Sequence, residues 1–168
     1  MFYGNASDFK SYLSERGREV SDDWADEDIN AALLVASEWL DNQYESSWIG
    51  YKLAFEQERS WPRQLAVVHS YPYHVYSNTD IPLQVIQATY EAAQRELTNK
   101  GSLQVDFKPS IYKSVSVHNA VVVEYNETVA SAGDVQTQIT VIQNLMSFLL
   151  DPSKAVDNNP LSGKIVRV

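Results

Sequence analysis

The sequence predicts a mainly α-helical protein with a small β component: a helical-bundle body of about four helices, a β-hairpin and an extended C-terminal arm. Apolar residues recur at helical spacing in four segments, near residues 7–17, 26–43, 82–98 and 135–150. Apolar and polar residues alternate in two further segments, near residues 103–107 and 113–125. The 168 residues, 44% of them hydrophobic, suit one ordinary domain. We therefore expect a body over residues 1–150 and an arm over residues 151–168.

The first two predicted helices have recognisable ends. Ser7 is a good N-cap for the first helix, and Gly17 suits the left-handed residue that often follows a helix. Asp26 is the expected cap of the second helix, with further acidic residues in the first turn, where the helix dipole favours them. The second helix has the most regular apolar stripe of the sequence: Ile29, Ala32, Leu33, Ala36 and Leu40.

The third and fourth helices are delimited by proline and glycine. Pro82 suits the first helical position of the third helix, which should end before Gly101. The fourth helix should end at Asp151, because a proline disfavours helical backbone in the residue before it. The polar face of the third helix is expected to consist of Gln84, Gln87, Glu91 and Gln94.

The remaining ordered segments lie between the helices. Valines alternate on both sides of His118-Asn119, a plausible turn, and this pattern predicts a small antiparallel hairpin. Residues 44–80 are too aromatic for a disordered linker and too irregular for a long helix. We expect them to form an ordered, loop-rich connection that packs on the helices.

The net charge argues against a protein whose main function is to bind nucleic acid, because affinity for nucleic acid comes largely from Lys and Arg side chains that contact phosphates. The net charge is −9 and the pI is about 4.7. The segment from Glu15 to Glu45 contains ten acidic residues and only two basic ones, Arg16 and Arg18. It therefore carries −8 of the total net charge. This block is either a solvated helix start and loop or a face that repels DNA or meets a basic partner.

Signatures of catalysis and of metal or cofactor binding are missing from the sequence. It has no cysteine, phosphate-binding glycine loop, nucleophile elbow or zinc-protease motif, and residues 22–28 lack the glycine and glutamate of a calcium loop. His69, His74 and His118 are expected to have structural roles. We predict a non-enzymatic protein without catalytic residues, metal ligands or cofactor, and without a membrane-spanning segment.

Aromatic side chains could stack on single-stranded bases, but such platforms are normally interleaved with basic residues. Lys52, Arg59 and Arg63 lie in the aromatic 44–80 stretch together with several acidic residues, so no basic groove emerges. Core packing and subunit contact are therefore the favoured roles of the aromatic residues.

Several ordered motifs resemble a family of phage proteins labelled DnaT-like. The similarity begins at Tyr3-Gly4-Asn5-Ala6-Ser7 and continues through the second helix. Its most distinctive part is Trp61-Pro62-Arg63 followed by Ile81-Pro82, and it ends near Leu145–Leu150. The resemblance covers about residues 3–150.

The resemblance implies a structural head-to-tail adaptor of a tailed bacteriophage, located in the virion neck and assembled in the host cytoplasm. Such a protein forms a ring with copies of itself, commonly a dodecamer, between the portal protein and the tail or tail-tube proteins. DNA would pass only as a duplex through the channel, and no membrane partner is expected. The DnaT-like label implies instead a single-stranded DNA-binding replication accessory protein, which the acidic composition disfavours. A small enzyme of unknown class is the third alternative.

Two groups of residues are candidates for partner binding. The first is the signature Trp61, Pro62 and Arg63. In the second, the apolar residues of the arm can add a strand to a partner's sheet edge while its basic residues meet acidic groups there. This second group consists of Leu161, Lys164, Ile165, Val166, Arg167 and Val168.

Overall fold

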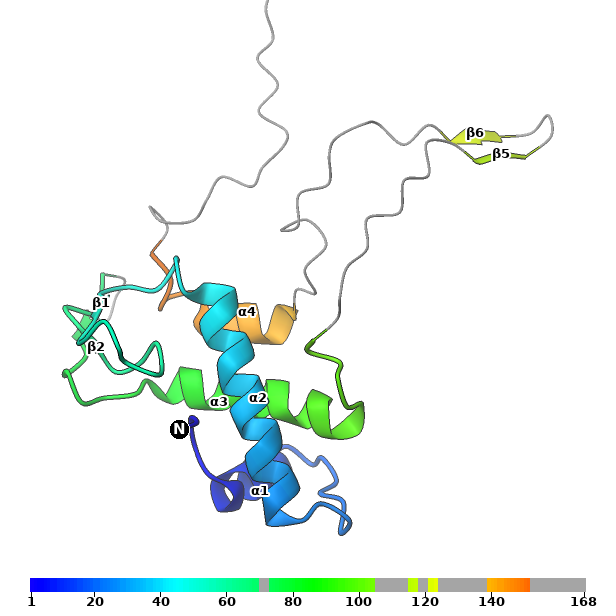
Figure 1. The fold of residues 1–168 in the computed structure, drawn as a ribbon, viewed down its shortest axis with the longest axis horizontal. Helices are drawn as coiled ribbons and strands as arrows, with labels where there is room; N and C mark the ends of the chain where they lie inside the picture. Colours follow the sequence, from blue (N-terminus) through cyan, green and yellow to red (C-terminus); the bar gives the residue numbers. More distant parts are fainter. Residues whose placement is uncertain (70–72, 105–114, 118–120, 124–138, 152–168) are drawn as a thin grey trace, which may run out of the picture. The chain divides into compact units, whose positions relative to one another are not determined.

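The computed structural model describes residues 1–69, 73–104, 115–117, 121–123 and 139–151. The chain divides into two units, the first formed by Met1–Val105 and Gln138–Ala155, the second by Asp106–Thr137 and Val156–Val168. Among these described residues, the first unit holds four helices and two small antiparallel strand pairs, and the second holds one such pair. The helices and several of the strands are labelled in Figure 1. The prediction of a mainly helical fold with a small β component is confirmed.

The helix α1 (Ala6–Glu15) begins one residue before the predicted cap. Ser7 is not the N-cap; the Asn5 side chain accepts a 2.9 Å hydrogen bond from the Asp8 N–H, which satisfies one of the free donors of the first turn. The helix ends as expected, with Gly17 in the left-handed conformation. The Gly17 and Arg18 N–H groups donate to the carbonyls of Ser14 and Leu13, so the last helical carbonyls are paired.

The long helix α2 (Asp26–Tyr44) confirms the most regular stripe of the sequence. All five stripe residues, Ile29, Ala32, Leu33, Ala36 and Leu40, are buried. The expected cap was wrong by one residue, because Ala25 is the N-cap and Asp26 lies in the first turn with Glu27 and Asp28. These acidic side chains favour the helix through its dipole and without a capping hydrogen bond.

Helix α3 (Leu83–Thr98) packs on α2 and on α4, and it places Val85, Tyr90 and Ala93 in the core. Pro82 is its N-cap and not its first residue. The predicted polar face is wrong at Glu91, which is buried. The Tyr12 hydroxyl and the Arg18 guanidinium donate to its two carboxylate oxygens, each at 2.9 Å, and this pairing makes the burial of the charge tolerable.

The last helix of the first unit, α4 (Thr140–Met146), is shorter than the predicted 135–150. Residues 147–151 leave the helix because their backbone pairs with residues 47–49. The Ile49 N–H donates to the Leu149 carbonyl at 3.0 Å, and the Asp151 N–H donates to the Ser47 carbonyl at 2.7 Å. Residues 135–138 lie outside the described residues.

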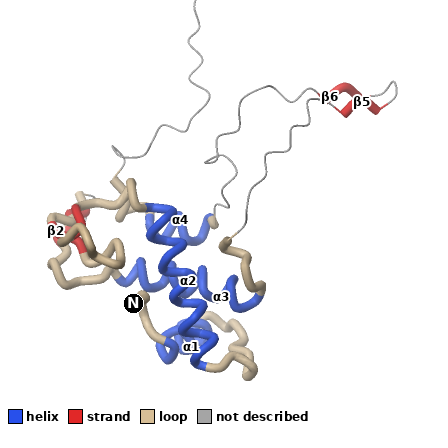
Figure 2. The backbone as a smooth tube through the Cα atoms, viewed as in Figure 1, coloured by secondary structure: helices blue, strands red, loops and turns tan. Residues whose placement is uncertain are grey.

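Residues 44–80 form the predicted ordered connection, and they contain strands that the sequence did not predict. Strand β1 (Tyr51–Lys52) pairs with β2 (Arg63–Gln64), and β3 (Val67–Val68) pairs with β4 (His74–Val75), both antiparallel. Loops and turns surround the labelled β2 (Figure 2). An aromatic column anchors this segment, with ring centroids 5.6–5.8 Å apart along Tyr44, Trp48, Trp61 and Tyr76. Core packing of these rings is confirmed.

In the second unit, β5 (Val115–Val117) pairs with β6 (Val121–Val123) in antiparallel register, which confirms the predicted hairpin within 113–125. The turn at His118-Asn119 lies outside the described residues. The strand near 103–107 is wrong for its described part, because residues 101–103 form a turn. This turn is held by the Glu96 carboxylate, which accepts from the Gly101 and Leu103 N–H groups.

Candidate functional site

The most unusual surface of the first unit is apolar and lies in the segment 51–75. Six of the eleven large hydrophobic side chains exposed among the described residues belong to this segment, and Phe55 is fully exposed. Soluble proteins rarely expose such side chains close together unless they bind a partner or ligand there. We call this set the aromatic surface; it consists of Tyr51, Leu53, Phe55, Leu65, Tyr73 and Val75.

An open groove of about 630 Å³ borders this surface. One side is formed by residues 49–51 together with Leu65, Val67 and His69, and the other by Ser147, Phe148, Leu150 and Asp151. The two sides are joined by the backbone pairing between residues 47–49 and 149–151. The His69 ring of the lining lies against the Tyr73 ring, with 6.2 Å between the centroids.

Two residues of the groove have left-handed backbone. Gly50 has φ +67°, and a β-carbon on it would lie 2.5 Å from the Gln64 carbonyl oxygen and 2.8 Å from the Ala66 nitrogen. Glycine is therefore required there both for the backbone conformation and for the close approach of two chain segments. Leu65 has φ +54° and is 71% exposed, which is uncommon for a bulky side chain.

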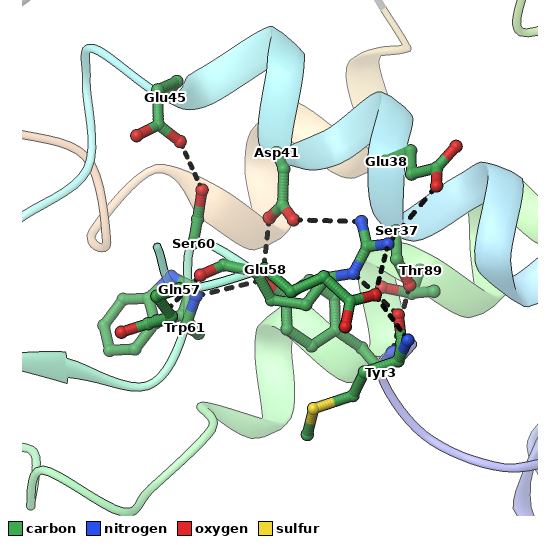
Figure 3. A network of polar contacts seen from close by, with 12 residues as sticks. Tyr3, Ser37, Glu38, Asp41, Glu45, Gln57, Glu58, Ser60, Trp61 and Thr89 are labelled. Atoms are coloured by element: carbon green, nitrogen blue, oxygen red, sulfur yellow. Dashed lines mark hydrogen bonds and ion pairs between the residues drawn. The ribbon is translucent and has the colours of Figure 1, made fainter. Parts of the chain in front are cut away.

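A buried polar network supports the loop that carries this surface (Figure 3). The Tyr3 hydroxyl donates to Asp41 Oδ1 at 2.7 Å and accepts from the Trp61 N–H at 3.0 Å. The Arg59 guanidinium donates to Asp41 Oδ2 at 3.3 Å and to the Met1 carbonyl at 2.7 Å. The network thus joins the N-terminal segment, α2 and the 57–64 loop.

Burial and charge pairing shift the protonation equilibria of this network. Burial raises the pKa of Asp41 above its ordinary value, although hydrogen bonds from Tyr3 and from the Ser60 backbone and the Arg59 charge oppose the shift. Burial works against the charge of Arg59, but the Asp41 and Glu38 carboxylates outweigh it and raise the pKa of Arg59. Asp41 and Arg59 therefore form an ion pair within the fold.

Arg63 is also part of the interior. Its side chain is 5% exposed, and it donates to the backbone carbonyls of Ile49, Gly50 and Ser60 at 2.9–3.2 Å. It thereby ties β2 to the chain beneath the groove. Burial lowers the pKa of Arg63, while the Glu45 carboxylate favours its charged form.

The first group of predicted partner-binding residues thus lies beneath the surface. Trp61 is fully buried and precedes a cis peptide bond to the partly buried Pro62. Together with Arg63, these side chains hold the segment that displays the aromatic surface. The second group, Leu161, Lys164, Ile165, Val166, Arg167 and Val168, lies outside the described residues.

Histidines and acidic residues do not gather into a metal-binding group among the described residues. His69 and His74 pack against the rings of Tyr73 and Tyr76, and His118 lies outside the described part. Within that same part, no helix has the length and hydrophobicity needed to span a membrane.

Sequence reasoning missed the aromatic surface, because aromatic residues of the 44–80 stretch divide between interior and exterior. Trp48 and Trp61 are buried, whereas Tyr51 and Tyr73 are 60% and 65% exposed. No local signal distinguishes the exposed residues, because Ile49, Tyr51, Leu53 and Phe55 alternate with small or polar residues, which is the pattern of a half-buried strand.

The family model described as "Putative DnaT-like ssDNA binding protein" matches residues 3–168 of the chain. No curated protein and no solved structure matches it. The match confirms the DnaT-like resemblance and overturns the prediction of a head-to-tail adaptor, because the family is described by binding of single-stranded DNA. The ring, portal and tail partners and the virion location were inferred from that assignment and are untested.

Proposed function

Because the chain belongs to the DnaT-like ssDNA-binding protein family, we propose that it binds single-stranded DNA through the aromatic surface. The observation that carries this proposal is the exposure of three aromatic rings, those of Tyr51, Phe55 and Tyr73, within one short segment. The β1–β2 and β3–β4 pairs bring the first and last of these residues into one loop-rich region.

Exposed rings are suited to single strands because every unpaired base offers a flat π-face. Stacking of a base on an aromatic side chain contributes about 1–3 kcal/mol and depends little on base identity. In a duplex these faces are covered by neighbouring bases. A surface of this kind therefore favours single-stranded over double-stranded DNA.

The acidic composition is compatible with this proposal because the negative charge is concentrated elsewhere. Outside residues 15–45 the chain has twelve acidic and eleven basic residues. Figure 1 shows the acidic 17–28 segment at the bottom of the view, near α1, and apart from β1 and β2 at its left. Part of the repulsion of phosphates therefore acts away from the aromatic surface, although Glu56 and Glu58 lie within the segment 51–75.

Few basic side chains at this surface are available to bind phosphates. Arg59 and Arg63 are buried, and the Lys52 ammonium lies 2.9 Å from a Glu45 carboxylate oxygen. We infer that the described surface binds mainly through base stacking, with a small electrostatic contribution.

Alanine in place of Tyr51, Phe55 or Tyr73 should weaken binding of an oligodeoxythymidylate by about 1–3 kcal/mol each, or about 5- to 150-fold, because one stacking partner is lost. Fluorescence anisotropy with a labelled oligomer measures the affinity, and thermal unfolding checks the fold. Leu83→Ala, at an exposed aliphatic residue that begins α3, is the control on a different surface.

The neighbouring variant Lys52→Met separates stacking from phosphate contact on the same strand. It should change the affinity less than Tyr51→Ala does, since the ammonium is already paired with Glu45. Equal affinity for the duplex, or unchanged binding by all three alanine variants, would refute the proposed interface.

A further inference from the structure

We propose that the groove beside the aromatic surface holds one unstacked base of the bound strand, and that Leu65 is kept in its unfavourable conformation to contact that base. This inference rests on the proposed function and deepens it. It assigns a base-binding site to a groove formed jointly by residues 49–51, the β2–β3 connection and the chain that follows α4.

The size and the lining of the groove suit a planar aromatic ligand. Its volume of about 630 Å³ falls within the range of small-ligand sites, about 300–1,000 Å³. Tyr51 and Phe148 supply two aromatic rings, and Leu65 and Val67 supply aliphatic contact. Ser147 and His69 place polar groups in the same lining, where the edge of a base needs hydrogen-bond partners.

The charge of the residues that line the groove favours binding of a base over binding of a phosphate. Among the residues that line the groove, Asp151 is the only charged type at neutral pH, and no lysine or arginine is present. A phosphate would meet the Asp151 carboxylate there, which is unfavourable. A neutral base carries no such penalty, so the sugar-phosphate backbone should lie at the rim.

Leu65 gives an independent argument for a ligand. Its left-handed backbone is strained for a branched side chain, and glycine or asparagine would suit the position better. Its side chain is 71% exposed, so little core packing offsets that strain. Strained residues that the fold itself does not need are concentrated at binding sites. A base in the groove would cover the leucine and explain its presence.

The decisive variant is Leu65→Asn, because asparagine has nearly the size of leucine and tolerates the left-handed conformation. We expect its melting temperature to equal or exceed that of the unmodified protein. Its affinity for a labelled oligodeoxythymidylate, measured by anisotropy, should fall at least about tenfold, since an apolar contact with the base is replaced by a polar group. Leu83→Asn, at a leucine that is 61% exposed and does not line the groove, should leave the affinity unchanged.

An abasic oligomer of the same length separates base from backbone recognition, since it keeps every phosphate but lacks the ring that the groove would hold. It should bind far more weakly than the oligodeoxythymidylate, and Leu65→Asn should make no further difference to it. Phe148→Ala, on the opposite side of the groove, should reproduce the loss seen with Leu65→Asn.

The outcomes distinguish this inference from the proposed function. Absence of binding to any single strand by the unmodified protein would refute the proposed function itself. Binding that is retained in Leu65→Asn and Phe148→Ala would overturn the base site while leaving the aromatic surface in place. Equal binding of the abasic oligomer would overturn the base site and also refute base stacking on the aromatic surface. A lower melting temperature of Leu65→Asn would show that the leucine serves the fold and would also overturn the inference.

Discussion

Gly50→Ala should destabilise the protein by about 3 kcal/mol. The left-handed backbone costs an alanine about 1–2 kcal/mol, and the crowding of an added methyl group in a packed site costs about 1–3 kcal/mol more. The crowding is unavoidable at Gly50 because the atoms nearest to the new β-carbon belong to the backbone of Gln64 and Ala66, 2.5–2.9 Å away. A flexible side chain could turn aside, but these atoms are fixed by the β1–β2 pairing.

Gly17→Ala is the matched control for this prediction. Gly17 has nearly the same left-handed φ, +64°, but no heavy atom lies within 4 Å of its added β-carbon. Gly17→Ala should therefore lower the free energy of unfolding only by the backbone contribution, about 1 kcal/mol. Urea unfolding of both variants gives the difference between the two free energies of unfolding. Equal losses would show that the groove floor can open to admit the methyl group.

The contrast between these glycines illustrates what the sequence could predict. Gly17 follows a short amphipathic helix, and that local pattern was sufficient to predict its left-handed conformation. The need for Gly50 depends on a chain segment about fifteen positions away, which no local pattern reveals. Strands of two residues, such as β1 and β2, are too short to show a period of two.

Helix interiors were predictable because a helix is long enough to show its period, whereas the strand pairs are too short to do so. The stripe of α2 from Ile29 to Leu40 repeats over about three turns, so its burial follows from spacing alone. Its first residue was misplaced because Ala25, which has no capping side chain, precedes three acidic residues that each suit a helix start. Glu91 could not be predicted to be buried, since its partners Tyr12 and Arg18 come from a distant segment.

The proposed binding surface escaped prediction because the sequence shows no basic groove and does not reveal which aromatic side chains are exposed. A net charge of −9 disfavours nucleic-acid binding when the charge is spread evenly, but most of it lies within residues 15–45. Exposure of Phe55 and Leu65 is equally hidden in a sequence, where an apolar residue is expected inside. Trp61-Pro62-Arg63 belongs to the most distinctive part of the family resemblance, yet Trp61 and Arg63 are buried and Pro62 is partly buried.

Arg59→Met should cost about 3–5 kcal/mol, the range for removal of one partner from a buried ion pair. The side chain of Arg59 is 5% exposed, and methionine leaves the Asp41 carboxylate buried without its cation. Lys10→Met removes a shorter ion pair, 2.6 Å to Asp26, whose side chains are well exposed. That control should cost about 0–1 kcal/mol, because water screens an exposed pair.

The loss in Arg59→Met should depend on pH in a direction set by Asp41. Burial already raises the pKa of Asp41, and without the guanidinium the pKa should rise further, since a stabilising charge is gone. A carboxyl group with a raised pKa in the folded state stabilises the fold when protonated, and this stability is lost as the pH rises through that pKa. Urea unfolding should therefore show a larger deficit at pH 7 than near pH 4.

Adding Asp41→Asn to Arg59→Met provides the sharpest check on this account. The amide keeps an acceptor for the Tyr3 hydroxyl but carries no charge to bury, so the double variant should be more stable than Arg59→Met at pH 7. The single variant Asp41→Asn should be destabilised, because Arg59 then loses its most buried anionic partner while Glu38 and Glu58 remain. A double variant that is less stable than both single variants would show that packing of the 57–64 loop, and not charge compensation, holds the aromatic surface in place.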